Sequence, residues 1–370
     1  MVHLSVVVTD LPLRVLCGQL LVGGFSGHAL TASFAKALAD GERAGAILFK
    51  RNLTGDLVAT ARLNAALRDA SRSDLPPLLA VDQEGGRVAR IGAPALVLPP
   101  MRTLGATGDA AFIGRVAEAQ AVELAALGFS MNFAPILDVH TRADNPVIGD
   151  RAFASDPDTV ARLGVAYAEG LARGGVMACG KHFPGHGDTN KDSHLDLPLV
   201  DHDRARLDAV EIVPFRAAAR AGIAALMTAH VLFPALDPGV PATLSRAVCT
   251  DLRREIGFEG VLISDDLEMK AVADTVGVEA SAVRAIDAGC DLLLVCTDEE
   301  LQARAHEALV RHAERDAAFR ARCVEAATRV LKMRRAVCPS PVTDRAALLQ
   351  IVGGQRSQAI AAEIAARTAS

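Results

Sequence analysis

Short apolar runs alternate along the chain with longer segments in which apolar residues recur at helical spacing. Eight of the runs have the length of a β-strand: residues 18–24, 45–50, 77–82, 129–135, 176–183, 224–231, 260–266 and 291–296. Several are apolar throughout, as is typical of parallel strands that are covered on both faces. Helical patterns such as residues 59–70 and 205–222 lie between them. Eight alternating units of this kind predict an α/β fold, a (β/α)8 barrel.

The first run is the weakest strand candidate, so a doubly wound sheet is the alternative to a barrel. From residue 298 to Val337 the pattern is helical, and Pro339 and Pro341 then interrupt it. A last helical pattern, SQAIAAEIAARTAS, follows them. We therefore expect a catalytic barrel over residues 1–337 and a helical tail over residues 338–370 that packs on it, without a second domain.

The composition argues against several classes of protein. Of the 370 residues, 51% are hydrophobic and 22% are charged, which is enough to fold around a large core. A formal net charge of −5, without a basic cluster, argues against a nucleic-acid surface. The seven cysteines lack CxxC spacing and are expected to be reduced core residues. Because neither a signal-peptide pattern nor a membrane-spanning run of about 18 apolar residues is found, we expect a cytoplasmic protein.

Charged and histidine residues gather directly after four of the predicted strands. DQEGGR follows the third strand, KHFPGHGD the fifth, AHV the sixth and SDD the seventh. In a barrel the carboxyl ends of the strands meet at one rim, where active sites lie. Ordinary loops favour Gly, Asn and Ser over repeated Asp, His, Lys and Arg. An active site at this rim is therefore favoured over the alternative that these residues only end the strands.

The segment after the third strand contains a carboxylate and two guanidinium groups. Asp82 ends the apolar run, and Arg87 and Arg90 follow it. A carboxylate beside a guanidinium can bind vicinal hydroxyl groups, because one accepts and the other donates a hydrogen bond. A structural ion pair is the equally supported alternative. The Asp150-Arg151 pair after the fourth strand adds little, since such neighbours on loops are usually solvated.

The most informative stretch is GKHFPGHGDTNKDSHLDLP, residues 180–198. Lys181 and His182 continue directly from an apolar strand and are therefore expected at the rim. Asp192 and His194 are two residues apart, so in an extended chain their side chains point the same way and can touch. A carboxylate that holds one imidazole nitrogen fixes the tautomer and raises the basicity of the other nitrogen. Such a pair suits a group that gives a proton and later takes one back.

A metal site and a purely structural loop are the alternatives for this stretch. His182, His186 and His194, together with Asp188 and Asp192, offer enough ligands for an ion. Their spacing matches neither HExxH nor a paired cysteine motif, which disfavours the metal site.

Two adjacent carboxylates, Asp265 and Asp266, end the seventh strand. In regular alternation only one of them faces the barrel axis. A carboxylate aimed at the axis can attack an anomeric carbon or stabilise an oxocarbenium-like transition state. The alternative role, an N-cap for the next helix, fits Asp266 better than Asp265.

Five segments together resemble the signature motifs of the family-3 glycoside hydrolases: DQEGGRV, NFAPILDV, NPVIGDRAF, KHFPGHGDTNKDSH and SDDLEMK. The loop that ends in Asp-Ser-His resembles in particular the bacterial β-N-acetylglucosaminidases of this family (NagZ type). The resemblance runs in order from about residue 18 to residue 335.

This resemblance implies a role for each matching residue. Asp265 would be the nucleophile, and His194 the general acid/base with Asp192 as its partner. Five residues would bind N-acetylglucosamine (GlcNAc): Asp82, Arg90, Arg151, Lys181 and His182. The implied reaction is retaining hydrolysis of a terminal β-linked GlcNAc, without metal or cofactor. In Gram-negative relatives the substrate is a GlcNAc-anhydromuramyl fragment recovered during cell-wall recycling. The expected partner is thus a small saccharide, bound by a monomer or weak dimer that contacts neither nucleic acid nor membrane.

Several other functions stay open from the sequence. A neutral imidazole repels an incoming anion less than a carboxylate would, so phosphorolysis is an alternative to hydrolysis. A β-glucosidase of broad specificity, a metal-dependent hydrolase and a sugar-binding barrel without activity are the others. Because the chain has no Trp and a single Tyr, Tyr167, any aromatic face against a sugar is expected from one of the twelve Phe residues.

Overall fold

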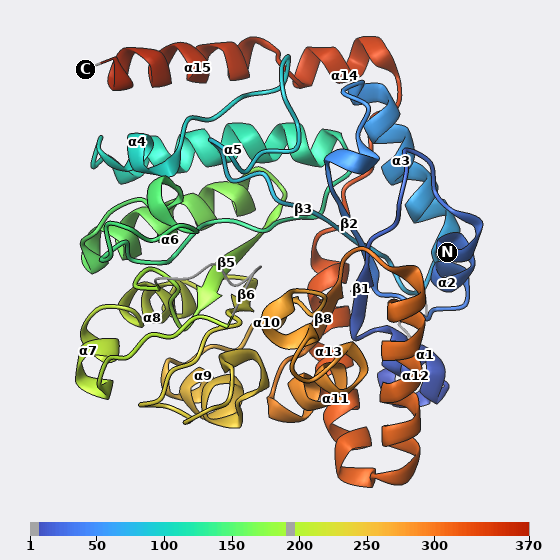
Figure 1. The fold of residues 1–370 in the computed structure, drawn as a ribbon. Helices are drawn as coiled ribbons and strands as arrows, with labels where there is room; N and C mark the ends of the chain where they lie inside the picture. Colours follow the sequence, from blue (N-terminus) through green and yellow to red (C-terminus); the bar gives the residue numbers. More distant parts are fainter. Residues whose placement is uncertain (1–6, 190–196, 370) are drawn as a thin grey trace.

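Eight parallel strands close into a barrel in chain order (Figure 1). The computed structural model describes residues 7–189 and 197–369. The strands are β1 Leu21–Gly23, β2 Gly45–Leu48, β3 Leu78–Val81, β4 Met131–Asn132, β5 Met177–Phe183, β6 Ala225–Thr228, β7 Val261–Asp266 and β8 Leu292–Val295. β1 pairs with both β2 and β8, which closes the barrel. Each strand lies within the residues predicted for it, so the (β/α)8 barrel is confirmed and the doubly wound sheet is excluded.

Helices surround the barrel. They are α1 Leu13–Gly18, α2 Ala32–Ala39, α3 Leu57–Ala70, α4 Met101–Gly105, α5 Ala110–Ala126, α6 Pro157–Arg173, α7 Arg204–Ala209, α8 Val213–Arg220, α9 Arg253–Glu255, α10 Lys270–Ala273, α11 Val278–Ala288, α12 Glu299–Arg315, α13 Ala317–Ala336, α14 Arg345–Ile351 and α15 Gln355–Thr368. Short 3-10 turns are η1 Val8–Asp10, η2 Lys50–Asn52, η3 Gly149–Arg151 and η4 Ala242–Leu244, and η5 Ala247–Leu252 is π-helical. Within the described ranges, none of these helices combines the length and the apolar character needed to cross a membrane.

The chain starts many of these helices with a side-chain cap. A Thr or Asp directly before the helix accepts a hydrogen bond from a backbone N–H of the first turn, which satisfies a donor that the helix itself leaves unpaired. The capping residues are Thr31, Asp56, Asp109, Asp156, Asp203, Asp298, Asp316 and Asp344.

The predicted helical segment over residues 205–222 is two helices, α7 and α8, and not one. Proline lacks a backbone N–H and its ring clashes with the preceding turn, so Pro214 is tolerated only near the start of a helix, where α8 has it. Between the two helices Glu211 turns inward and is 1% exposed, and its carboxylate accepts a hydrogen bond from Arg206.

The strands are buried on both faces. On β3, Leu78 and Ala80 belong to the apolar cluster inside the barrel, while Leu79 and Val81 belong to the larger cluster between strands and helices. This alternation explains why the run is apolar throughout. Six of the seven cysteines are buried and free, as predicted, whereas Cys338 is exposed because it lies beyond the end of α13.

The C-terminal helices α14 and α15 lie against α5, and α15 also contacts α4 (Figure 1). Leu348 of α14, Val352 directly after it and Ile364 of α15 are buried in the same cluster as the outer faces of the strands. The division of the chain at residue 337 into a barrel and a tail stays a prediction.

Candidate active site

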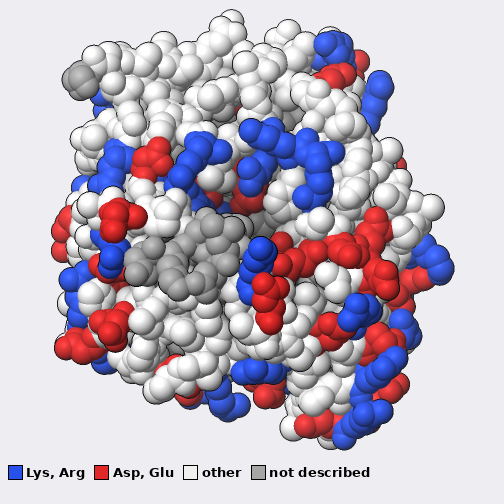
Figure 2. Space-filling view, in the orientation of Figure 1, with Lys and Arg blue, Asp and Glu red and all other residues white. Residues whose placement is uncertain are grey.

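A cavity of about 210 Å³ opens among the carboxyl ends of the strands. Figure 2 shows a hollow near the middle of one face of the molecule, with Lys and Arg side chains along its upper edge. Six of the predicted site residues line the cavity: Asp82, Arg90, Arg151, Lys181, His182 and Asp265. The structure thus brings together side chains from four separate segments of the chain. The predicted pair Asp192 and His194 lies outside the described residues.

A network of buried ion pairs forms one side of the cavity. The ammonium group of Lys181 lies 2.9 Å from Asp82 Oδ1 and 2.7 Å from Glu84 Oε1. Arg151 donates two hydrogen bonds of 2.9 Å to the carboxylate of Glu84. Arg90 reaches Asp82 Oδ2 at 3.3 Å, which is the ion pair proposed as the alternative from the sequence. Because every charge in this network has a partner, its side chains are held in fixed orientations around the cavity.

Glu84 is the residue of this network that the sequence did not single out. Its burial favours the neutral acid, but Arg151 and Lys181 outweigh the burial and hold the pKa of Glu84 well below its usual range. In the same way, Asp82 and Glu84 overcome the burial of Lys181 and raise its pKa. In the sequence, the only local sign that Glu84 belongs to the site was its position two residues after Asp82, which places both side chains on the same side of an extended chain.

The adjacent residues Asp150 and Arg151 do not pair with each other. Arg151 turns inward to Glu84, while Asp150 lies at the surface with its Oδ1 3.6 Å from Nε of Arg87. The guanidinium of Arg87 also donates to the backbone carbonyl of Val147, which lines the cavity. The segment after β4 is therefore tied to the segment after β3 by three contacts.

A second buried carboxylate, Asp138, orients His182. Asp138 is fully buried, and its Oδ2 lies 2.7 Å from Nδ1 of His182. Its Oδ1 accepts backbone N–H groups from His182 and His186, at 3.1 and 2.7 Å. Burial raises the pKa of Asp138, but His182 and His186 more than compensate, so the pKa is lowered. Since the anionic carboxylate accepts from Nδ1–H, Nε2 is the nitrogen of His182 that can meet a ligand.

The surroundings of His186 favour its neutral form at neutral pH. Its burial and the nearby His182 lower its pKa to about 4. Its Nδ1 lies 2.7 Å from the hydroxyl of Thr189. The ring stands edge-on to His182, with 5.7 Å between the centroids. His186 lines the cavity, although the sequence pointed to it only as a potential metal ligand.

Irregular strand ends bring adjacent side chains to the same cavity. The pairing of β5 with β6 shifts between Lys181 and Phe183, and both Lys181 and His182 line the cavity. The pairing of β7 with β8 shifts between Ile263 and Asp266. Asp265 and Asp266 both line the cavity next to this shift, and the Oδ1 of Asp266 is directed to the backbone N–H groups of Glu268 and Cys296.

Asp266 is not the N-cap of the following helix. Its Oδ1 accepts the backbone N–H groups of Glu268 and Cys296, at 3.1 and 3.2 Å, and so ties β7 to the end of β8. Met269 occupies the position before α10. His230, from the segment after β6, contacts the backbone of Asp266: its Nε2 lies 2.9 Å from the carbonyl oxygen of Asp266. Asp265 uses its Oδ1 to accept the N–H of Asp266 at 2.8 Å.

Phe49 and Phe133 provide the aromatic surface of the cavity. The guanidinium groups of Arg51 and Arg90 lie 4.4 and 5.7 Å from the centroid of the Phe49 ring. Tyr167 is buried elsewhere, with its hydroxyl 2.6 Å from Gln120 Oε1. Two of the twelve phenylalanines therefore line the cavity, whereas the single tyrosine does not.

Among residues 7–189 and 197–369, one set of three side chains lies close enough together to share a metal ion. It consists of Asp188, His202 and Glu211, whose potential ligand atoms are within 4.8 Å of one another. This set differs from the ligands considered from the sequence, of which only Asp188 belongs to it. In the described structure, His182 and His186 instead direct Nδ1 to Asp138 and Thr189.

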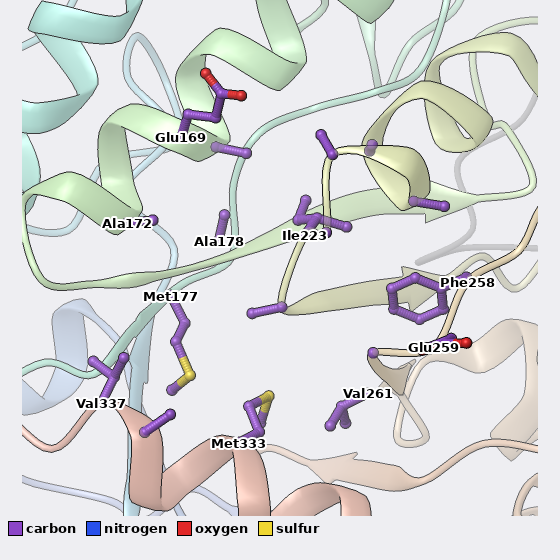
Figure 3. A pocket seen from close by; sticks show the side chains of 18 of the residues that line it. Glu169, Ala172, Met177, Ala178, Ile223, Phe258, Glu259, Val261, Met333 and Val337 are labelled. Atoms are coloured by element: carbon purple, nitrogen blue, oxygen red, sulfur yellow. The ribbon is translucent and has the colours of Figure 1, made fainter.

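A larger cavity of about 590 Å³ lies at the opposite, amino-terminal ends of β5, β6 and β7. Figure 3 shows Met177, Ile223, Phe258 and Met333 around it. Its lining is mainly alanine and other apolar residues, and the side chains of Glu169, Glu259 and Lys332 are exposed at its edge. The smaller cavity is the candidate active site because it is the one that gathers oriented carboxylates, cations and histidines.

The substitution Asp266→Asn tests the ionisation of this carboxylate. Burial, assisted by Glu268 and Asp265, raises the pKa of Asp266 to about 7. The folded state thus binds this proton more tightly than the unfolded state, and the stability that the group contributes below pH about 4 is lost as the pH rises through 7. Asparagine keeps an Oδ1 acceptor for both N–H groups and cannot ionise. We expect the free energy of unfolding of Asp266→Asn to exceed that of the wild type by roughly 2–4 kcal/mol at pH 8 and to equal it near pH 4. Urea unfolding measures both values. A difference that does not change with pH would contradict this assignment.

Comparison with known proteins identifies the family of this chain. Residues 13–333 match the family model described as the glycosyl hydrolase family 3 N-terminal domain. A protein named β-hexosaminidase from Neisseria meningitidis serogroup C is 39% identical over 290 residues, which cover 76% of this chain and 79% of that protein.

Two solved structures extend this likeness to the fold. A family 3 β-N-acetylglucosaminidase from Paenibacillus superposes with a TM-score of 0.88 and 37% identity, over 97% of this chain and 69% of that chain. NagZ from Neisseria gonorrhoeae, solved with N-trifluoroacetyl-D-glucosamine, gives a TM-score of 0.80 and 34% identity, over 95% of this chain and 98% of that chain. The chain therefore belongs to glycoside hydrolase family 3 and is a glycoside hydrolase.

Proposed function

We propose that this enzyme is a retaining exo-β-N-acetylglucosaminidase that removes a terminal β-linked GlcNAc from small saccharides. The observation that carries the proposal is the convergence of Asp265 with the Lys181 network and with His182 around one cavity. The names of the relatives, β-hexosaminidase and β-N-acetylglucosaminidase, point to the same sugar. As natural substrates we propose cell-wall fragments of the GlcNAc-anhydromuramyl type, cleaved in the course of cell-wall recycling.

In the first half of the reaction Asp265 attacks the anomeric carbon of the GlcNAc unit. The bond from this carbon to the leaving-group oxygen breaks as the new bond to the carboxylate forms, and a covalent glycosyl-enzyme results. We assign the protonation of the departing oxygen to His194, with Asp192 as its partner. In the second half His194 takes a proton from water, which attacks the same carbon and releases Asp265. Two inversions at one carbon retain the β configuration.

The charged groups around the cavity suit the hydroxyl groups of one sugar ring. Asp82 accepts hydrogen bonds, Arg90, Arg151 and Lys181 donate them, and His182 presents Nε2. The cavity, at about 210 Å³, is smaller than the roughly 300–1,000 Å³ of sites that enclose drug-sized ligands. A site of this size encloses one terminal unit and leaves the remainder of the substrate outside, which supports exo cleavage.

An assay of the wild-type enzyme with four reaction mixtures tests this proposal. Aryl β-GlcNAc and aryl β-glucoside are each incubated with and without inorganic phosphate, and the anomer first released is followed by NMR. We expect β-GlcNAc as the first product from the GlcNAc substrate and little turnover of the glucoside. Equal turnover of both substrates would favour the broad-specificity β-glucosidase, and GlcNAc-1-phosphate as the product would favour the phosphorylase.

The substitution Asp265→Asn tests the nucleophile. The amide is nearly the same size as the carboxylate but is a poor nucleophile, so kcat for aryl β-GlcNAc should fall by about a thousandfold or more. Asp266→Asn is the matched control, because it changes the neighbouring carboxylate on the same strand end. Comparable losses in both variants would contradict a specific role for Asp265.

The substitution His194→Ala tests the general acid. Substrates with poor leaving groups need protonation of the departing oxygen, whereas an activated 4-nitrophenyl glycoside needs little. We expect kcat/KM to fall by roughly a hundredfold or more for an unactivated disaccharide and far less for the formation of the glycosyl-enzyme from the aryl substrate. Equal losses on the two substrates would count against His194 as the acid.

A further inference from the structure

The segment that carries Asp82 and Arg90 is held in place by the residues that follow it. We call residues 82–90 the β3 rim segment and residues 91–98 the brace segment. Oε1 of Gln83 accepts the backbone N–H groups of Arg90 and Ile91, at 2.7 and 3.0 Å. The backbone carbonyl of Leu98 accepts the N–H of Gly86 at 2.9 Å. The position of the β3 rim segment therefore depends on that of the brace segment.

The brace segment is in turn fixed by a buried carboxylate on α5. Glu123 is 3% exposed, and its Oε2 accepts the backbone N–H of Leu96 at 2.7 Å. Its Oε1 accepts the N–H of Gly353 at 2.8 Å and the hydroxyl of Ser357. One carboxylate thus joins the brace segment to the start of α15, about 260 residues later in the chain.

Packing reinforces this connection. Gly353 has a φ of +72°, and a Cβ added there would lie 2.4 Å from the backbone oxygen of Pro94. The turn between α14 and α15 therefore lies directly on the brace segment. Leu96 and Leu98 share one apolar cluster with Leu348 and Val352 of the C-terminal region.

We infer that Glu123 is a positioning residue for the reaction, through which α14 and α15 hold the sugar-binding side of the cavity in place. Glu123 acts through Leu96 and Leu98 on the β3 rim segment and does not line the cavity itself. The inference rests on the proposed function where it treats Asp82 and Arg90 as sugar ligands. It gives the C-terminal helices a role in substrate affinity and not in the chemical step.

Glu118 provides a matched control on the same helix. Its carboxylate also binds the C-terminal region, through Arg356 of α15, and it accepts a second hydrogen bond from Arg173 of α6. Its side chain is 26% exposed. Glu118→Gln therefore weakens a contact of α15 without touching the hydrogen bond to Leu96.

Three full-length variants test the inference: Glu123→Gln, Ser357→Ala and Glu118→Gln. Glutamine at 123 turns one acceptor oxygen into an NH2 donor, which then faces either Leu96 or Gly353, both of which are donors. Ser357→Ala removes a single hydrogen bond of α15, and it is the second test of the inference if Glu123→Gln does not fold. The measurements are kcat and KM for aryl β-GlcNAc, the inhibition constant of the product GlcNAc, and backbone hydrogen exchange over residues 84–98.

We expect Glu123→Gln to raise both KM and the GlcNAc inhibition constant by roughly fivefold, with kcat nearly unchanged, because the loss falls on ground-state and transition-state binding alike. Hydrogen exchange over residues 84–98 should accelerate in the same variant. Ser357→Ala should show a smaller change in the same direction, and Glu118→Gln should behave like the wild type.

The inference is overturned if Glu123→Gln and Ser357→Ala have the same KM, GlcNAc inhibition constant and hydrogen-exchange rates as Glu118→Gln. A lower kcat with unchanged KM also overturns it, since this result means only that less protein is folded. Failure of the proposed function has a separate signature, a wild type that does not cleave aryl β-GlcNAc. In that case the exchange of residues 84–98 still decides whether Glu123 fixes the β3 rim segment.

Discussion

The candidate active site depends on the burial of Glu84 between two cations. Moving a carboxylate out of water costs several kcal/mol unless opposite charges and hydrogen bonds replace the lost hydration. Lys181 comes from β5, Arg151 from the segment after β4, and Glu84 from the segment after β3. Because none of the three is tolerated in the interior without the others, they fix the relative positions of three rim segments. Asp82 and Arg90 are attached to this arrangement through Lys181.

The barrel could be predicted from the sequence because each strand carries its own local signal. Runs such as residues 291–296 are apolar throughout, and this pattern follows from burial on both faces of a parallel strand. Helix breaks were harder to predict, as the single pattern over residues 205–222 shows. The effect of Pro214 on that pattern is local and could have been anticipated, but the inward turn of Glu211 depends on tertiary contacts.

The residues that line the cavity could be predicted from motifs, whereas most of their partners could not. Lys181 and His182 were expected at the rim because they continue an apolar strand. Asp138 and Glu84, which orient them, lie in other segments of the chain, and no local pattern states which cation a buried carboxylate will meet. Asp265 and Asp266 both line the cavity beside a register shift between β7 and β8 that strict alternation does not predict.

The cavity at the amino-terminal end of the barrel lies away from the candidate active site. Its lining alanines and methionines lie across the full height of the strands from Asp265. Close packing favours interiors without voids, so larger apolar side chains at such positions are a means of thermostabilisation. Residues such as Ala178 and Ala224 line this cavity and not the one that contains Asp265, so substitutions that fill it leave the lining of the candidate active site unchanged.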